Sequence, residues 1–189
     1  IVTQRELEEQ LKNRELETLA PRSGREPAAA TPAPNRRCGG RPGADAGVVN
    51  LKSVVMIQCV GSRDEQHPYC SRICCTQALK NSLAIKRQSP ETQVIVLYRD
   101  LRSYGFRERL YREARRAGVI FLEYSERNKP MVLIENNQLK VNVVVQPDNQ
   151  SIALEADRLV LSAGIEAEPG NTALAQLLKV PLNADGFFL

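Results

Sequence analysis

Residues 54–60 read Val-Val-Met-Ile-Gln-Cys-Val, a nearly continuous apolar run of the length of one strand. Such a run is typical of a parallel strand that is buried on both of its faces. A polar loop follows it, and the sequence from Ser71 to Arg87 then predicts a helix with its apolar side chains mostly on one side. Strand, loop and helix in this order predict the first unit of a parallel α/β sheet.

The same alternation continues toward the C-terminus. Residues 94–98 and 119–122 predict two more buried strands, and between them residues 106–117 predict an amphipathic helix that Gly118 ends. Short strands separated by turn residues come next, at residues 131–135, 139–145 and 151–155, and they predict an antiparallel meander. A last apolar strand at 158–161 leads into Ser162-Ala163-Gly164, and residues 172–178 predict a short helix.

This order of elements predicts the fold class. A parallel βαβαβ sheet, an antiparallel β-meander and a returning strand are the layout of the dinucleotide-binding domain in two-domain flavin disulfide reductases. We therefore expect an FAD/NAD(P)-binding, thioredoxin-reductase-like α/β domain over residues 51–165.

The N-terminal part has a different composition. Residues 3–19 predict a short helix, because Thr3 and Glu6 have the spacing of a capping box. From Ala20 to Gly47 the chain is rich in Pro, Ala, Gly and Arg, which predicts a flexible segment over about 20–50. The chain starts at Ile1 rather than Met and ends at Leu189 without an obvious terminal element, so we expect a fragment.

Composition excludes several classes of protein. The 189 residues carry a net charge of +4, and the excess is concentrated in an arginine-rich stretch. That stretch is either a solvated helix face or a docking face for an acidic electron-transfer partner, and it has no pattern typical of nucleic-acid binding. No apolar run reaches the length of a membrane span, and no signal-peptide core precedes the domain, so we expect a cytoplasmic protein. The arginines concerned are Arg102, Arg107, Arg109, Arg112, Arg115 and Arg116.

The turn after the first strand lacks the expected nucleotide fingerprint. In a dinucleotide-binding domain this turn carries G-x-G-x-x-G, whose glycines let the pyrophosphate approach the backbone. Here Gly61 is the one glycine, and the loop continues through Glu65, Gln66, His67 and Pro68. A nicotinamide-dependent disulfide reductase is therefore disfavoured.

Cysteines occupy that position instead. Four of the five cysteines lie in this region with the spacing C-x10-C-x3-C-C: Cys59, Cys70, Cys74 and Cys75. We expect the first at the end of the strand and the others at or just inside the next helix, with Cys70 and Cys74 on one helical face. Thiolates near a helix N-terminus are favoured by its partial positive charge.

Spacing alone leaves four interpretations of these cysteines open. Four thiolates match an all-cysteine iron–sulfur cluster, whereas structural zinc sites usually show paired C-x2-C knuckles, which are missing here. A redox-active dithiol or disulfide and unliganded buried thiols are the other two. We expect the isolated Cys38 to be a bystander and His67, the one histidine, to be an ordinary loop residue.

Several segments resemble a known family. The sequence is similar to the iron–sulfur A-subunit of CoB–CoM heterodisulfide reductase, together with its homologues, over roughly residues 50–189, with a further likeness from Val2 to Glu9. The segments that carry the resemblance are 55–64 (VMIQCVGSRD), 68–75 (PYCSRICC), 96–106 (VLYRDLRSYGF), 159–165 (LVLSAGI) and 178–188 (LKVPLNADGFF). The stretch from about 20 to 47 does not match the family.

The resemblance implies a flavoprotein oxidoreductase with added [4Fe–4S] clusters. It places the four clustered cysteines at the positions that ligate the cluster beside the flavin, and Lys80 at a position expected to hydrogen-bond the flavin ring. Ser162, Ala163 and Gly164 would allow close approach to FAD, or would simply form a tight turn. It also implies that residues 1–19 are a linker helix and that 166–189 begin the return to an FAD domain, which would hold most of the FAD.

Two functional hypotheses follow. In the first, the chain is an electron-transfer segment that relays electrons between flavin and iron–sulfur clusters. The resemblance then implies as partners the other subunits of a heterodisulfide reductase-like complex, ferredoxin, and hydrogenase or dehydrogenase proteins. The alternative is a zinc-stabilised protein-binding module without redox activity. No residue has the pattern of an acid–base catalyst, and the identity of the metal separates the two hypotheses.

Overall fold

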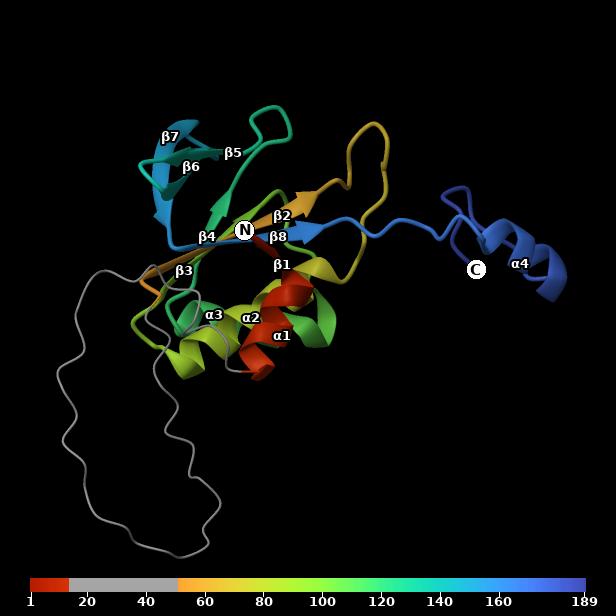
Figure 1. The fold of residues 1–189 in the computed structure, drawn as a ribbon, viewed down its shortest axis with the longest axis horizontal. Coiled ribbons are helices and arrows are strands. Elements are labelled where there is room, and N and C mark those ends of the chain that lie inside the picture. The colour runs from red at the N-terminus through yellow and green to blue at the C-terminus, as the bar shows by residue number, and fades with distance from the viewer. Residues whose placement is uncertain (14–50) are drawn as a thin grey trace, which may run out of the picture.

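The computed structural model describes residues 1–13 and 51–189. The predicted flexible segment at 20–50, Cys38 within it and the last residues of the predicted N-terminal helix lie outside the described residues. Figure 1 shows the described chain as one sheet-and-helix body with a C-terminal extension.

The central element is a five-stranded parallel sheet with the strand order β1-β8-β2-β3-β4. Its strands are β1 (Val2–Thr3), β2 (Ser53–Val60), β3 (Gln93–Tyr98), β4 (Ile120–Glu123) and β8 (Arg158–Ala163). A second, antiparallel sheet has the order β5-β6-β7, formed by β5 (Met131–Glu135), β6 (Gln138–Val145) and β7 (Gln150–Ala156). The predicted parallel βαβαβ sheet and antiparallel meander are both confirmed.

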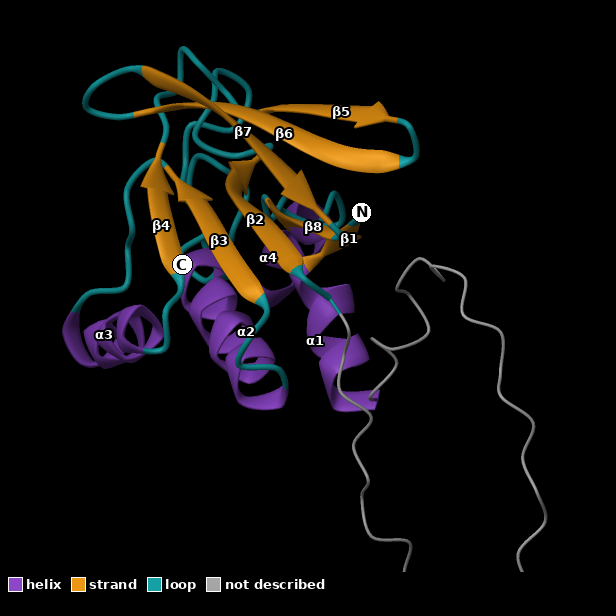
Figure 2. Cartoon of the chain, turned by 90° about the vertical axis from the view of Figure 1, so that its left-hand side faces the viewer, coloured by secondary structure: helices purple, strands orange, loops and turns teal. Residues whose placement is uncertain are grey.

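Three helices cover one face of the parallel sheet, and the antiparallel sheet lies over the other, as Figure 2 shows. The helices are α1 (Gln4–Asn13), α2 (Cys74–Gln88) and α3 (Glu108–Arg116), and a short 3₁₀ turn, η2 (Gly105–Arg107), precedes α3. The fourth helix, α4 (Asn171–Leu178), lies away from the sheet. None of the helices in the described ranges is long and apolar enough to cross a bilayer.

The apolar run of β2 explains why the sheet has two covered faces. Val54 and Met56 pack in the cluster beneath the helices, whereas Val55 and Ile57 pack in the cluster beneath the antiparallel sheet. Side chains alternate between the faces of a strand, so a strand covered on both sides needs apolar residues at every position. All four are 5 % exposed or less.

The N-terminal residues join this core. The sequence predicted one helix beginning at Thr3, but the chain first forms β1, which pairs with β8 through Val2 and Val160. The capping box is present, since the Thr3 backbone N–H donates to a Glu6 carboxylate oxygen at 2.6 Å and the Glu6 N–H donates to Thr3 Oγ1 at 3.3 Å. Leu7 of α1 is completely buried, so this helix packs as part of the domain.

The strand order creates a switch point between β2 and β8. The chain leaves β2 through α2 toward β3 on one side, while β8 pairs with β2 on the other side. In open α/β sheets, ligands bind outside the carboxyl ends of the strands at such a point. Two segments meet there. One is the loop at residues 61–73 that follows β2 and contains Cys70, which we call the cysteine loop, and the other is the turn at Gly164 that follows β8.

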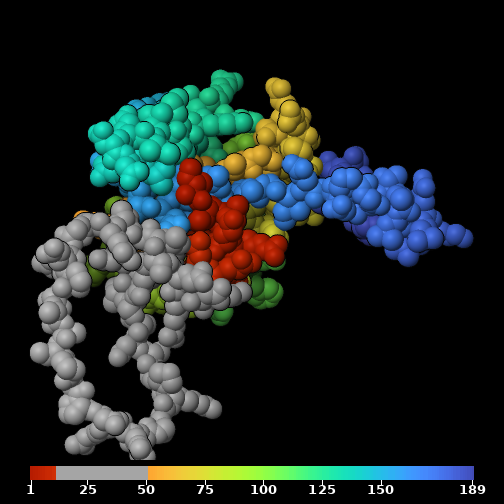
Figure 3. Space-filling view, in the orientation of Figure 1, coloured from red at the N-terminus to blue at the C-terminus, as the bar shows by residue number. Residues whose placement is uncertain are grey.

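The C-terminal segment projects from the body as an extended stretch that ends in α4 and a turn (Figures 1 and 3). Several apolar side chains of α4 are exposed, among them Leu174 and Leu177. The final turn reaches back to the cysteine loop, where the rings of Phe187 and Tyr69 pack edge to face at 5.4 Å.

Candidate functional site

A β-bulge aims Cys59 at the end of β2. Ile57 pairs with Leu161 and Val60 pairs with Ala163, so Gln58 and Cys59 of β2 together oppose the single residue Ser162 of β8. Cys59 has a φ of 60°, in the left-handed region that non-glycine residues seldom adopt. Bulges and left-handed residues gather where a fold must re-aim a side chain at a functional site.

The loop after the bulge is closed by its own hydrogen bonds. The Arg63 N–H donates to the Tyr69 carbonyl at 3.1 Å, and the Asp64 N–H donates to the His67 carbonyl at 3.2 Å. The Asp64 carboxylate in turn accepts the His67 N–H at 2.8 Å, and this hydrogen bond lowers the pKa of Asp64. These hydrogen bonds fold the loop back on itself, so that Cys70 lies near the end of β2, which carries Cys59.

Helix α2 begins at Cys74, three residues later than the sequence predicted. Arg72 has a φ of 64°, which breaks any helix through residues 71–73, and no side chain caps the first turn. The expectation that Cys70 and Cys74 share one helical face is therefore wrong, because Cys70 lies in the loop. Cys74 and Cys75 occupy the first turn of α2, where backbone N–H groups lack helical partners and the dipole favours negative charge.

The structure brings all four predicted cysteines together. The thiols of Cys59 and Cys70 raise the pKa of both Cys74 and Cys75 through their charge, so the four sulfurs lie within electrostatic reach of one another. All four are free thiols; Cys75 is buried and the others are half-buried. The loop and the start of α2 thus place the four thiols near one another at the end of β2.

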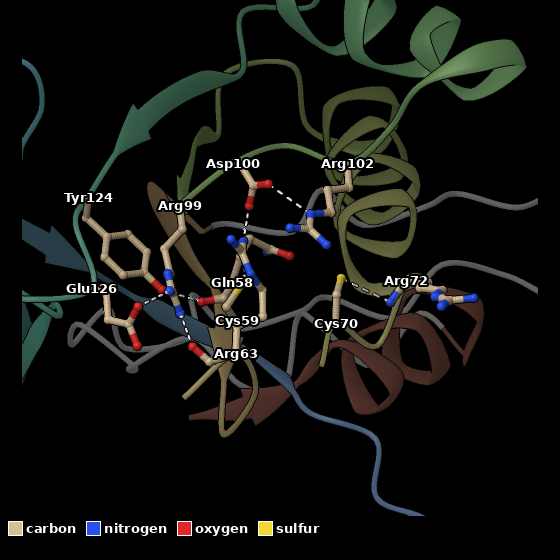
Figure 4. Close-up of polar contacts among 10 residues, drawn as sticks. All are labelled: Gln58, Cys59, Arg63, Cys70, Arg72, Arg99, Asp100, Arg102, Tyr124 and Glu126. Atoms are coloured by element: carbon tan, nitrogen blue, oxygen red, sulfur yellow. Dashed lines mark hydrogen bonds and ion pairs between the residues drawn. The ribbon is translucent and has the colours of Figure 1, made fainter. Parts of the chain in front are cut away.

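Each of these sulfurs has a polar hydrogen directed at it. The Arg72 N–H donates to Cys70 Sγ at 3.3 Å, and the Arg63 guanidinium lies 4.0 Å from Cys59 Sγ (Figure 4). Cys74 receives hydrogen bonds from its own N–H and from the Ser71 hydroxyl, and Cys75 receives one from the Arg102 N–H. Hydrogen bonds of this kind stabilise negative charge on sulfur.

Burial works against these hydrogen bonds in the metal-free chain. Burial is the largest influence on Cys74 and Cys75 and raises the pKa of both thiols, with neighbouring thiols adding to the rise. Both residues are therefore protonated at neutral pH when no metal is bound. Metal binding must displace these protons, because the thiolate is the ligand.

A thiol-modification experiment checks this state. In metal-free chain at pH 7, we expect iodoacetamide to modify Cys74 and Cys75 more slowly in the folded chain than in urea, since burial and the raised pKa both reduce accessible thiolate. The difference should shrink as the pH rises toward the raised pKa values. Peptide mass spectrometry measures both rates, and equal rates in folded and unfolded chain at pH 7 would contradict the buried arrangement.

A charged network holds the strand end from the other side. The Arg99 guanidinium donates to the Arg63 carbonyl at 2.8 Å and pairs with Glu126 at 2.5 Å, and Arg63 pairs with Asp100 (Figure 4). The buried Tyr124 hydroxyl donates to the Gln58 carbonyl at 2.5 Å. We did not predict these residues as part of the site. Their position in the sequence could have indicated this role, because Arg99 and Asp100 directly follow β3, whose carboxyl end lies beside that of β2.

The end of β8 is tied to the cysteine loop. The Gly164 N–H donates to the Val60 carbonyl at 2.7 Å, and the Ile165 N–H donates to Ser71 Oγ at 2.9 Å. A Cβ on Gly164 would lie 2.4 Å from the Gly61 carbonyl oxygen, so only glycine fits here. Ser162 and Ala163, predicted to follow the strand, are its last residues.

The predicted flavin-facing residues fall into two grooves beside α1. Ser162, Ala163 and Gly164 line an open groove of about 540 Å³ together with Cys74. Ser162 is 1 % exposed, and its Oγ has no hydrogen-bond partner among the described residues. Lys80 is exposed and lines a separate groove with Asn81 and Leu110, so the structure does not bring it to the other three.

His67 lies apart from the thiols. Its ring packs against Tyr69, with its nitrogens 3.9 Å from Asp64 and 3.8 Å from Glu166. Within residues 1–13 and 51–189, no three His, Cys, Asp or Glu side chains are arranged around the position of a single metal ion.

Comparison with known proteins gives clear relatives for the sequence. The chain is 42% identical over 143 residues to the iron–sulfur A-subunit of CoB–CoM heterodisulfide reductase from Methanocaldococcus jannaschii, which covers 71% of this chain and 21% of that protein. It is 38% identical over 168 residues to the A-subunit of ferredoxin:CoB–CoM heterodisulfide reductase from Methanosarcina acetivorans, covering 85% of this chain and 20% of that one. No protein-family model matches the chain.

Among solved structures, thioredoxin reductase from T. acidophilum matches with a TM-score of 0.46 and 11% identity, over 72% of this chain and 38% of that chain. The sequence relatives are far longer than the chain, which spans about one fifth of their length. Over the part that matches, the chain belongs to the A-subunit family of CoB–CoM heterodisulfide reductase.

Proposed function

We propose that this chain is the cluster-binding segment of a flavin-dependent iron–sulfur oxidoreductase and relays electrons between flavin and iron–sulfur clusters. The observation that carries the proposal is the grouping of Cys59, Cys70, Cys74 and Cys75 at the switch point, where each sulfur faces a polar hydrogen. The names of the relatives, which are heterodisulfide reductase subunits, support the same reaction class.

Cys59, Cys70, Cys74 and Cys75 are the proposed ligands of a [4Fe–4S] cluster. Their chemistry fits the group, since all-cysteine ligation is the usual way to hold such a cluster. A bound cluster would supply a centre that accepts and releases single electrons. The chain's own residues contribute four thiolates, the positive end of α2, and the hydrogen bonds from Arg72, Ser71 and Arg102 that stabilise negative charge on the sulfurs.

The sequence pattern of the cysteines favours a cluster over a structural zinc ion. Structural zinc sites usually show paired C-x2-C knuckles, whereas these four cysteines have the spacing C-x10-C-x3-C-C. The identity of the bound metal separates the two proposals.

We propose further that Lys80, Ser162, Ala163 and Gly164 face the flavin in the longer parent protein. The unpartnered Oγ of Ser162 is a buried polar atom on the wall of the groove beside Cys74, as a site for a polar cofactor requires. Lys80 would supply a positive charge that stabilises reduced flavin. Its ammonium is exposed and can approach a cofactor that the rest of the parent protein binds.

Partners of the parent protein follow from the same proposal. The names of the relatives include ferredoxin or H2 beside the heterodisulfide. We propose that the parent of this chain works with other subunits of such a complex and with ferredoxin, hydrogenase or dehydrogenase proteins.

Metal analysis tests the proposed function. After anaerobic purification we expect about four iron atoms and four acid-labile sulfides per chain, with an EPR signal from a reduced cluster after dithionite treatment. Zinc in place of iron, with no sulfide, would reject electron transfer and leave the zinc-stabilised binding module as the function of this segment.

A further inference from the structure

The segment from Arg99 to Gly118 concentrates the positive charge of the chain. Its seven arginines against three carboxylates give a net charge of +4, which equals the net charge of all 189 residues. The segment has no lysine, although lysine occurs both before and after it. Arginine is enriched and lysine depleted at protein–protein interfaces relative to other surfaces, so this choice is typical of a contact surface.

Exposed aromatic rings accompany these arginines. The Phe106 side chain is fully exposed, at 103 %, and Tyr104 is 73 % exposed. Phe106 and Gly105 line an open groove of about 360 Å³ with Arg109 and Arg112. We call Tyr104, Phe106, Arg107, Arg109 and Arg112 the arginine surface.

The arginines of this surface form no ion pair with the described residues of the chain. Arg102 pairs with Asp100 at 2.8 Å, and Glu113 pairs with Arg87 at 3.0 Å. Arg107, Arg109 and Arg112 are exposed and make no ion pair with any residue in the described parts of the chain. Three unpaired guanidinium groups beside an exposed phenyl ring can contact a partner without first breaking a bond of the fold.

The arginine surface begins next to the sulfur group. The Arg102 N–H hydrogen-bonds the Cys75 thiol; Tyr104 follows in the same loop, and Phe106 lies in η2 directly after it. Figure 4 shows Asp100 and Arg102, in the segment that leads to this surface, above Cys59 and Cys70. A protein bound here would contact the segment that continues from Arg102, whose backbone N–H hydrogen-bonds the Cys75 thiol.

We propose that the arginine surface is the docking site for an acidic, one-electron carrier protein. This inference rests on the proposed function, because the carrier is useful only if the four cysteines bind a cluster. Positive charge steers an acidic partner to this side of the domain, and Phe106 with Tyr104 provides the apolar contact at its centre. On docking, the reduced carrier would lose one electron, and a cluster held by Cys59, Cys70, Cys74 and Cys75 would accept it, with no bond made or broken.

Binding of an acidic two-cluster ferredoxin, used as the probe, tests the surface. The full 189-residue chain should bind it at 50 mM salt and more weakly at 200 mM, because salt screens exposed charges. The double variant Arg109→Glu/Arg112→Glu should bind at least about tenfold more weakly. Isothermal titration calorimetry measures each dissociation constant.

A matched variant controls for net charge. Arg127 and Lys129 are exposed in the loop after β4, so Arg127→Glu/Lys129→Glu changes the chain's charge by the same amount at a different place. We expect this variant to lose less than about twofold in affinity. Equal losses in the two double variants, or no binding by the unaltered chain at 50 mM salt, would overturn the proposal.

Phe106→Ala separates contact from charge. The side chain is fully exposed, so the thermal unfolding midpoint should stay unchanged while affinity for the probe falls about threefold or more. Unchanged affinity would remove Phe106 from the docking site and reject the surface as defined above. Iron content of every variant is measured alongside: normal iron with no docking rejects this inference alone, whereas docking without iron rejects the proposed function alone.

Discussion

Replacing Cys74 with alanine should reduce the iron and acid-labile sulfide of the chain from about four each to less than about one. Cys74 is in the first turn of α2, where it receives hydrogen bonds from its own N–H and from Ser71. Without this thiolate, one iron of a bound cluster would lack a protein ligand, so the cluster would be lost more easily. The half-buried side chain is small, so the fold should persist, as circular dichroism would verify.

Two further variants show whether the loss is specific. Cys38→Ala removes the fifth cysteine, which lies outside the C-x10-C-x3-C-C pattern, and should leave iron and sulfide unchanged. Ser71→Ala removes a hydrogen bond to Cys74 and the acceptor of the Ile165 N–H, but no ligand, so iron should remain. The reduction potential should fall, because the bond to Cys74 stabilises the more negative reduced state. Full iron content in Cys74→Ala would show that Cys74 is not a ligand.

The elements of the fold could be predicted because each follows from a local pattern. Residues 131–135 were predicted as a strand and form β5 with the same bounds, since turn residues at Asn136 and Asn137 end it. β1 could not be predicted, because two residues are too short for any periodicity. It exists because β8 offers an open edge to Val2 and Thr3.

The grouping of the cysteines could also be predicted, but its geometry could not. The sequence from Val54 to Val60 has the composition of an uninterrupted strand, and nothing local marks the bulge at Gln58 and Cys59. The bulge depends on β8, which is contributed from far along the chain. The hydrogen bond from Arg102 to Cys75 likewise joins the loop after β3 to the first turn of α2, and only the packed fold brings them together.

Gly164 was predicted to be part of the site, but the structure gives a different reason why a glycine is needed there. Its small size was predicted to allow close approach of FAD or to form a tight turn. The structure gives a contact within the chain, because the backbone of Gly164 lies directly against the Gly61 carbonyl and donates to the Val60 carbonyl. The sequence alone could not identify Gly61 as the neighbour of Gly164, because Gly61 follows β2 and Gly164 follows β8, about a hundred residues later.

The Gly164→Ala variant should therefore have a lower free energy of unfolding, and it should also bind less iron. The added Cβ would meet the Gly61 oxygen at 2.4 Å and Ser62 Cβ at 3.1 Å, and a backbone carbonyl cannot move aside as a flexible side chain can. Overpacking of this kind costs about 1–3 kcal/mol, so we expect a loss of about 2 kcal/mol in the free energy of unfolding. Urea denaturation followed by circular dichroism measures this change.

The effect on the cysteines distinguishes this contact from an ordinary packing defect. Relief of the clash must push Gly61 and the cysteine loop away from β8, which breaks the Gly164–Val60 hydrogen bond and moves Cys59 relative to Cys74. We expect iron per chain to fall below about half of the unaltered value even in native buffer, where the fold persists. Gly170→Ala is the control, because a Cβ there meets nothing within 4 Å, and it should keep its iron and lose less than about 1 kcal/mol. If Gly164→Ala kept its full iron content, then the turn after β8 would not position the cysteine loop, and the two strand ends would act independently at the switch point.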